Sequence, residues 1–272
     1  MWSPRSPTLH IGLSAQRLTV AKTGGLWPGK LAVCDVIHCA EVAEAAEAEP
    51  WRPAVTALAQ LLAEPGYRKP RLHIVLSGRF VRWQLLPWRP ELTQPKEVSA
   101  YASMRFRETF GKAADDWQVL HSVQPPGKTV PACAVDAALM EALRNTCEAA
   151  GARLAGVTPY FACAFDRWRT ALKGKTVWFG LIESDCLSLG LLQGDNWLGL
   201  RTQRLDGDWR DALPGMMAQI GISAGLADSS APLYLAGSGE PPATSAKLPF
   251  VWLQPKAQTA PAMVGCRMAL GV

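Results

Sequence analysis

Residues 221–225, GISAG, are the first candidates for enzyme chemistry in this sequence. They match the G-x-S-x-G turn, which presents a nucleophilic serine after a strand and needs an acid and then a histidine later in the chain. All four histidines precede Ser223, and the residues before Gly221 have a helical pattern. Both observations argue against a serine hydrolase, and the sequence predicts the C-terminus of a helix here.

Two GKT triplets, at 127–129 and 174–176, resemble the end of a phosphate-binding loop. In the complete motif a glycine stands five residues before the second glycine, because the loop wraps its backbone around the phosphates. Ser122 and Arg169 occupy those two positions. The triplets are therefore predicted to be loop turns.

The segment CDVIHC, residues 34–39, brings two cysteines and a histidine close together, as at the start of a zinc site. A structural zinc site needs four ligands, usually in two close pairs, whereas the other five cysteines are isolated. We predict no metal, and cysteines that are small buried residues. Seven cysteines without a C-x-x-C spacing favour a reducing compartment over a disulfide framework.

The composition is that of a globular protein, with 49% apolar and 19% charged residues. The apolar stretches are all shorter than the roughly 18 residues that a membrane span needs, and the N-terminus lacks the apolar core of a secretory signal. We therefore expect a soluble protein that stays in the cytoplasm.

Eleven tryptophans, several next to an arginine, are the other compositional feature. Arginine and aromatic side chains bind single-stranded nucleic acid, but they are also typical of protein-binding surfaces. The net charge of +5 is scattered along the chain, without a basic cluster or an RNP-like signature. This favours a protein partner over nucleic acid.

The hydrophobic pattern divides the chain into three parts. Residues 1–79 contain three alternating strands, a helix between Pro53 and Pro65, and a fourth strand. Residues 80–157 follow a β-α-β-β-α-β order, and residues 158–272 return to the opening plan of three strands, a helix and a strand. The sequence therefore predicts an α/β protein with duplicated halves and a subdomain inserted into the first.

This plan resembles the actin-like ATPase superfamily, whose fold is ribonuclease H-like. Within it, the chain is similar to the cytoplasmic actin-like proteins of type IV pilus assembly and type II secretion, the PilM-like and GspL-like proteins. Four segments carry the resemblance: HIGLSAQRLTVAK (10–22), the hairpins of 176–207, PLYLAGSGEP (232–241) and the terminal MVGCRMALGV (263–272).

The phosphate hairpins depart from the pattern that the resemblance implies. Active members present an aspartate followed two residues later by a glycine, so that a carboxylate holds Mg²⁺ and the backbone approaches phosphate. Ser14 and Gln16 fall at these positions in the first hairpin, and Gly180 and Ile182 in the second. We therefore expect a vestigial cleft with no metal, no cofactor and no catalysis.

Two observations leave an alternative open. Gly237 and Gly239 keep the glycine pair that closes over adenosine, and a shift of two or three residues in the second hairpin brings Glu183 or Asp185 into the carboxylate position. The alternative is an ATP-binding actin-like ATPase or nucleotide switch.

The resemblance also implies a partner. Proteins of this type lie on the cytoplasmic face of an inner-membrane platform, bind the short cytoplasmic tail of a bitopic membrane protein and communicate with the motor ATPase. The tail is expected in a groove between the first half and the inserted subdomain. By residue chemistry, Arg79, Arg82, Trp83 and Trp88 in and beside one strand are our predicted anchor surface, on an exposed sheet edge.

Overall fold

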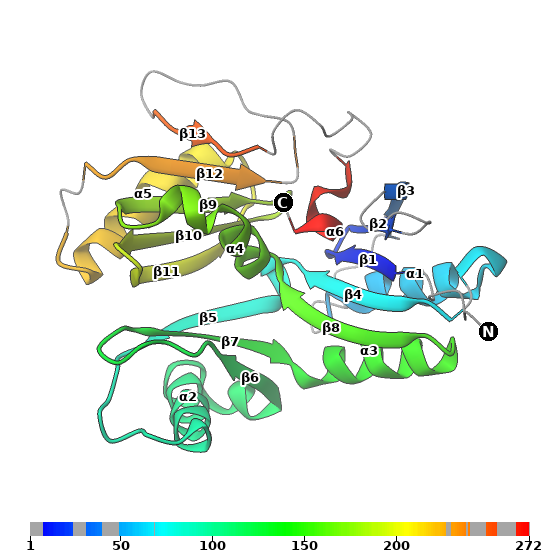
Figure 1. Cartoon of the computed structure of the whole chain (residues 1–272), viewed down its shortest axis with the longest axis horizontal. Coiled ribbons are helices and arrows are strands. Elements are labelled where there is room, and N and C mark those ends of the chain that lie inside the picture. The colour runs from blue at the N-terminus through cyan, green and yellow to red at the C-terminus, as the bar shows by residue number, and fades with distance from the viewer. Residues whose placement is uncertain are drawn as a thin grey trace, which may run out of the picture.

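The computed structural model of the chain describes residues 8–23, 31–39, 49–67, 69–226, 230–237, 239, 249–254 and 265–271. These residues form two five-stranded sheets and one three-stranded sheet, with helices packed between and around them (Figure 1). Within these ranges, none of the helices has the length and apolar character that crossing a membrane requires.

The first sheet has the strand order β3-β2-β1-β4-β8. Its strands are β1 (Thr8–Leu13), β2 (Arg17–Thr23), β3 (Leu31–His38), β4 (Arg71–Leu76) and β8 (Arg153–Pro159). The first three form the antiparallel meander expected from their alternating pattern, and β1, β4 and β8 run parallel. Helix α1 (Arg52–Ala63) packs on this sheet through Leu58 and Leu61, with a proline in its first turn.

The second sheet, β11-β10-β9-β12-β13, repeats this plan. Its strands are β9 (Thr176–Ile182), β10 (Cys186–Gln193), β11 (Asn196–Arg204), β12 (Leu233–Gly237) and β13 (Val251–Trp252). Strands β9 to β11 form a meander, α5 (Trp209–Ser223) follows, and β12 then pairs parallel with β9. The predicted duplication of the α/β half is confirmed.

The small sheet has the order β5-β7-β6 and consists of β5 (Val81–Leu86), β6 (Trp117–His121) and β7 (Val130–Asp136). Helix α2 (Pro95–Phe110) covers it and buries Ala102 and Phe106 in a separate core. Thr129 ties this unit to the second half: its N–H and hydroxyl donate to Asn196 Oδ1, and its hydroxyl also lies within hydrogen-bond distance of the Trp197 carbonyl.

The predicted β-α-β-β-α-β order is present, but its last helix and strand belong to the first half. Helix α3 (Ala137–Ala149) buries Leu139 and Leu143 in the core that α1 and the first sheet share, and β8 pairs with β4. The apolar face of α3 therefore packs in the core shared with α1, a core that also includes Cys133 and Val135 of β7. The division of the chain at residues 79 and 157 remains a proposal.

Two helices join the halves. Helix α4 (Tyr160–Leu172) follows β8 and packs on β9, while the terminal α6 (Arg267–Leu270) lies against β1 (Figure 1). A Cβ on Gly12 of β1 would lie 2.8 Å from Met268 Cγ, so a glycine there permits the close approach of α6. The four residues of α6 are fewer than the terminal helix that the sequence predicts, and residues 261–264 lie outside the described residues.

The cysteines depart in one respect from the prediction of free thiols. Cys34 on β3 and Cys266 at the start of α6 form a disulfide that connects the two ends of the chain. Cys133, Cys147 and Cys186 are free and buried as expected, and burial raises the pKa of Cys133 and Cys147 to about 11. Among the described residues, no group of three or more His, Cys, Asp or Glu could hold a metal.

The three glycine motifs have the predicted structural roles. GISAG lies at the C-terminus of α5, where Gly225 has φ +69°. Gly127 and Gly174 of the GKT triplets have φ +82° and +74° and lie in turns. Each glycine therefore supplies backbone conformation rather than chemistry.

Candidate functional site

The turns of the two equivalent hairpins face the cleft between the halves. Ser14 N–H donates to the Arg17 carbonyl at 3.0 Å, and Glu183 N–H donates to the Cys186 carbonyl at 2.9 Å. The matching bonds make Ser14 the structural equivalent of Glu183, and Gln16 that of Asp185. A carboxylate pair therefore occupies the second turn, whereas the first has none.

The sequence prediction places the turn of the second hairpin three residues too early in the chain, at Gly180 instead of Glu183. Gly180 and Ile182 lie in β9 and pair with Leu189 and Leu187 of β10, so neither is in the turn. A Cβ on Gly180 would lie 2.6 Å from Leu235 Cδ2, so this glycine permits close packing within the second half. Strand β9 is apolar and buried on both faces, so its sequence pattern does not fix the register of the hairpin.

Gly237, at the end of β12, has a packing role as well. A Cβ there would lie 2.7 Å from the Ile182 carbonyl oxygen, whereas a Cβ on Gly239 would meet nothing within 4 Å. Gly237 therefore lies close to the end of β9, and the proposed role of Gly237 and Gly239 towards adenosine rests on the resemblance.

A cavity of about 400 Å³ opens at the tips of the two hairpins. Gln16 lines it from the first turn and Asp185 from the second, while Arg79 and Arg204 also contribute. The Ser14 hydroxyl is engaged internally, donating to the Arg17 carbonyl. Asp206, which pairs with Arg204, lines the cavity as well. The cleft therefore combines the carboxylates of Asp185 and Asp206 with two guanidinium groups.

The Glu183 carboxylate joins the two halves. It is buried, and its Oε1 accepts from the Gly78 N–H at 2.8 Å and from Cys186 Sγ at 3.3 Å. Burial raises its pKa to about 7, and the nearby Asp185 adds to this, while hydrogen bonds from Ser77, Gly78 and Cys186 act in the opposite direction. The 3₁₀ helix η3 (Gly78–Phe80) is thus held against the second hairpin by a carboxylate that titrates near neutral pH.

Glu183 has little remaining capacity for ligand chemistry. A Cβ on Gly78 would lie 3.0 Å from Glu183 Oε1, so the contact between the halves is tight. Its Oε2 is buried and has no hydrogen-bond partner within the described part of the chain. Asp185 lines the open cavity, so it is the hairpin carboxylate available to a metal or a phosphate-bound water.

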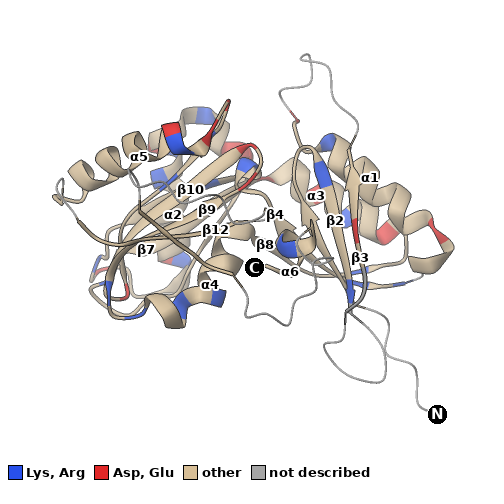
Figure 2. Cartoon of the chain, turned by 90° about the horizontal axis from the view of Figure 1, so that it is seen from above, with Lys and Arg blue, Asp and Glu red and all other residues tan. Residues whose placement is uncertain are grey.

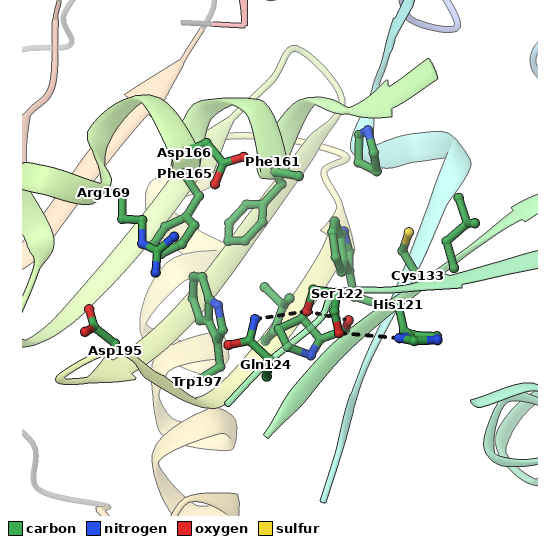
Figure 3. Close-up of a pocket in the computed structure, with 16 residues that line it drawn as sticks. His121, Ser122, Gln124, Cys133, Phe161, Phe165, Asp166, Arg169, Asp195 and Trp197 are labelled. Carbon is green, nitrogen blue, oxygen red and sulfur yellow. Dashed lines mark hydrogen bonds between the residues drawn. The ribbon is translucent and has the colours of Figure 1, made fainter. Parts of the chain in front are cut away.

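A second site is an apolar groove of about 310 Å³ between the small sheet and the second half (Figure 3). Phe161 and Phe165 of α4 and Trp197 of β11 form one wall, with ring centroids 5.6 and 4.7 Å from Trp197. Trp83 of β5, whose ring lies 5.8 Å from that of Phe161, and Leu120 of β6 form the other. Polar side chains surround this aromatic floor, namely His121, Ser122, Gln124, Asp166, Arg169 and Asp195.

The groove differs in position from the one expected. A cavity of only about 20 Å³, lined by Leu76 and Val157 of the first half, lies between that half and the small sheet. It shares Leu120, Cys133 and Pro159 with the larger groove, so the two adjoin. Most of the open volume is therefore next to α4 and β11, because Thr129 holds the small sheet against β11.

Three of the four predicted anchor residues meet in the structure. Arg79, Arg82 and Trp83 line one cavity, and Trp83 also lines the apolar groove. Trp88 is 43% exposed and lines none of the cavities described here. Strand β5 is at an edge of the small sheet as predicted, but β11 lies alongside it (Figure 1), so that edge is not open.

Sequence reasoning missed Phe161, Phe165 and Trp197. Phe161 and Phe165 stand four residues apart on α4 and so share one helix face, a spacing that a helical reading of YFACAFDRW contains. Trp197, which follows the β10–β11 turn, gave no comparable signal.

Comparison with known proteins gives the fold a reference. No family model matches the chain, and no curated protein matches it. A chain of the solved "PilM-PilN type IV pilus biogenesis complex" gives TM-score 0.58 and 19% identity, over 86% of this chain and 82% of that one. The cytoplasmic domain of EpsL, an inner membrane component of the Vibrio cholerae type II secretion system, gives 0.61 and 12%, over 98% and 96%.

A third structure, a Bacteroides thetaiotaomicron protein with an actin-like ATPase fold and unknown function, gives TM-score 0.58 and 13% identity, over 98% of this chain and 96% of that one. Identities this low establish similarity of fold. Together with the duplicated sheets, they show that this chain has the actin-like fold, in the form seen in PilM-like and GspL-like proteins.

Proposed function

We propose that this protein is a non-catalytic adaptor of a type IV pilus or type II secretion-like assembly platform, and that its apolar groove binds a short cytoplasmic segment of an inner-membrane partner. The observation that carries the proposal is an aromatic groove in this protein, whose fold is similar to that of a chain in the solved PilM–PilN complex. In this proposal the adaptor lies on the cytoplasmic side of the inner membrane. It is held there by its membrane partner and contacts the motor ATPase.

The groove suits an extended peptide with apolar anchors. Strand β6 pairs only with β7 among the described strands, so its other edge is available for an added strand. Leu120 and His121 of β6 line the groove, which places that edge beside the aromatic floor. An added strand would then place alternate side chains beside Leu120, on the face of the small sheet that also carries Trp83.

The Leu120→Asp variant tests the groove. Leu120 is 49% exposed, so the substitution should keep the fold, but it places a carboxylate where an apolar anchor must be desolvated. We expect at least about tenfold weaker binding of a labelled peptide that carries the short cytoplasmic tail of the cognate bitopic membrane protein, measured by fluorescence anisotropy.

Ile222→Asp is the matched control, because Ile222 on α5 is 70% exposed and lies outside the groove. Equal affinity of both variants and the wild type would refute the groove as the binding site. Failure of the wild type to bind the segment would refute the adaptor proposal itself.

A nucleotide switch is the second candidate, favoured by Asp185 in the cleft cavity. We expect no change in melting temperature with millimolar Mg²⁺-ATP or Mg²⁺-ADP, because the first hairpin offers Ser14 and Gln16 in place of a carboxylate. A ligand at a hundredfold excess over Kd would stabilise the fold by about 2.7 kcal/mol. A Mg²⁺-dependent shift that Asp185→Asn abolishes would favour the switch.

A further inference from the structure

A cavity of about 480 Å³ beside the small sheet is lined by four arginines. Arg79 belongs to η3, Arg82 to β5, and Arg201 and Arg204 to β11. The described residues that line it include no carboxylate. Two segments that are more than a hundred residues apart in sequence therefore place like charges around one space.

The arginines are poorly neutralised. Arg204 pairs with Asp206 at 3.5 Å, and the Arg82 guanidinium lies 4.1 Å from the centre of the Trp117 ring. The side chains of Arg79 and Arg201 make no hydrogen bond or ion pair with any described residue. The Asp136 carboxylate also attracts the Arg82 guanidinium, so the four guanidinium groups have two carboxylate partners. The remaining positive charges repel one another, and an anion between them relieves that repulsion.

This cavity is distinct from the two sites described above. Neither hairpin turn, 14–16 or 183–185, contributes to it, although Arg79 and Arg204 line the cleft cavity as well. Trp83 and Leu200 line it on one side and the apolar groove on the other. Elsewhere the charges are mixed: acidic and basic segments alternate around α5 and are spread over both halves (Figure 2).

We propose that this cavity binds a phosphorylated small molecule. The planar guanidinium fork matches phosphate oxygens in bidentate geometry. The Thr109 hydroxyl already donates to the Arg105 carbonyl and the Thr202 hydroxyl is paired with that of Ser188, so the guanidinium groups supply the donors in this proposal. Phe110 and Trp83 give the rest of the ligand an aromatic wall. The volume lies within the range of about 300–1,000 Å³ that small-molecule sites occupy.

Isothermal titration of the full chain with inorganic pyrophosphate, at fixed ionic strength, tests this site. We expect saturable binding with one site per chain, weakened at least about tenfold by Arg201→Ala because a charge-assisted hydrogen bond is lost. Arg167→Ala, on the exposed surface of α4, makes the same charge change away from the cavity and should bind as the wild type does.

Three results would overturn the proposal. The first is that pyrophosphate does not bind the wild type. The second is that Arg167→Ala weakens binding as much as Arg201→Ala, which indicates attraction by net charge alone. In the third, Arg201→Ala has no effect while Asp185→Asn changes the affinity, which places the anion in the cleft.

A hexaglutamate peptide, titrated in parallel, should bind more weakly than pyrophosphate. Tighter binding of the peptide would assign the cavity to an acidic protein segment instead.

Discussion

Glu183→Gln should remove a pH dependence of about 3 kcal/mol from the free energy of unfolding, since one pKa unit corresponds to about 1.4 kcal/mol. The pKa of Glu183 rises from 4.5 to about 7 in the folded protein, chiefly through burial. Between these values the folded state binds the proton more strongly than the unfolded state, so wild-type stability falls as the pH rises. The contribution is fully present below pH 4.5 and is lost by the time the pH passes about 7.

Glutamine keeps an oxygen that accepts from the Gly78 N–H but carries no charge at any pH. Asp185, Cys186 and Tyr160 are the groups that face Glu183. Burial raises the pKa of Tyr160, the charge of Glu183 raises it further, and Arg267 lowers it. Guanidinium unfolding at pH 4.5 and pH 8 measures the difference between variant and wild type.

Glu141→Gln on the exposed face of α3 is the control and should leave the pH dependence unchanged. If Glu183→Gln and the wild type differ by the same amount at both pH values, Glu183 does not change protonation in this range. If the prediction holds, the contact between the halves weakens as the pH rises, because a charged carboxylate is then buried at it.

Reduction of the Cys34–Cys266 disulfide should lower the free energy of unfolding by about 4 kcal/mol. The disulfide joins residues 232 positions apart, so it restricts the unfolded chain over most of its length. In a reducing cytoplasm the pair would be two thiols, and α6 would then depend on Met268 and Ala269 packing against the first half. The purified oxidised protein should therefore be more stable than the reduced one.

Urea unfolding with and without reductant measures this difference, and the Cys34→Ser variant should reproduce the reduced value in both conditions. Cys163→Ser, which leaves the disulfide intact, is the control. A Cys34→Ser variant as stable as the oxidised wild type would show that the cross-link contributes nothing beyond packing.

Local pattern was sufficient for the elements and for the fold. Alternation along residues such as Leu9, Ile11 and Leu13 predicts strands, and the order of meander, helix and parallel strand occurs twice, which is enough to indicate two actin-like halves. The missing carboxylate at Ser14 was also visible, because it depends only on residue type in a short turn.

Tertiary structure alone decided which faces meet. It placed Glu183 rather than Gly180 at the second turn, assigned α3 and β8 to the first half, and opened the groove beside Phe165. It also gathered Arg79 and Arg201 from segments more than a hundred residues apart. A strand buried on both faces, such as β9, leaves its register free, and a helix's apolar face fits any adequate core. The competition among those packings, settled by burial of the largest apolar surface, is absent from any local window of sequence.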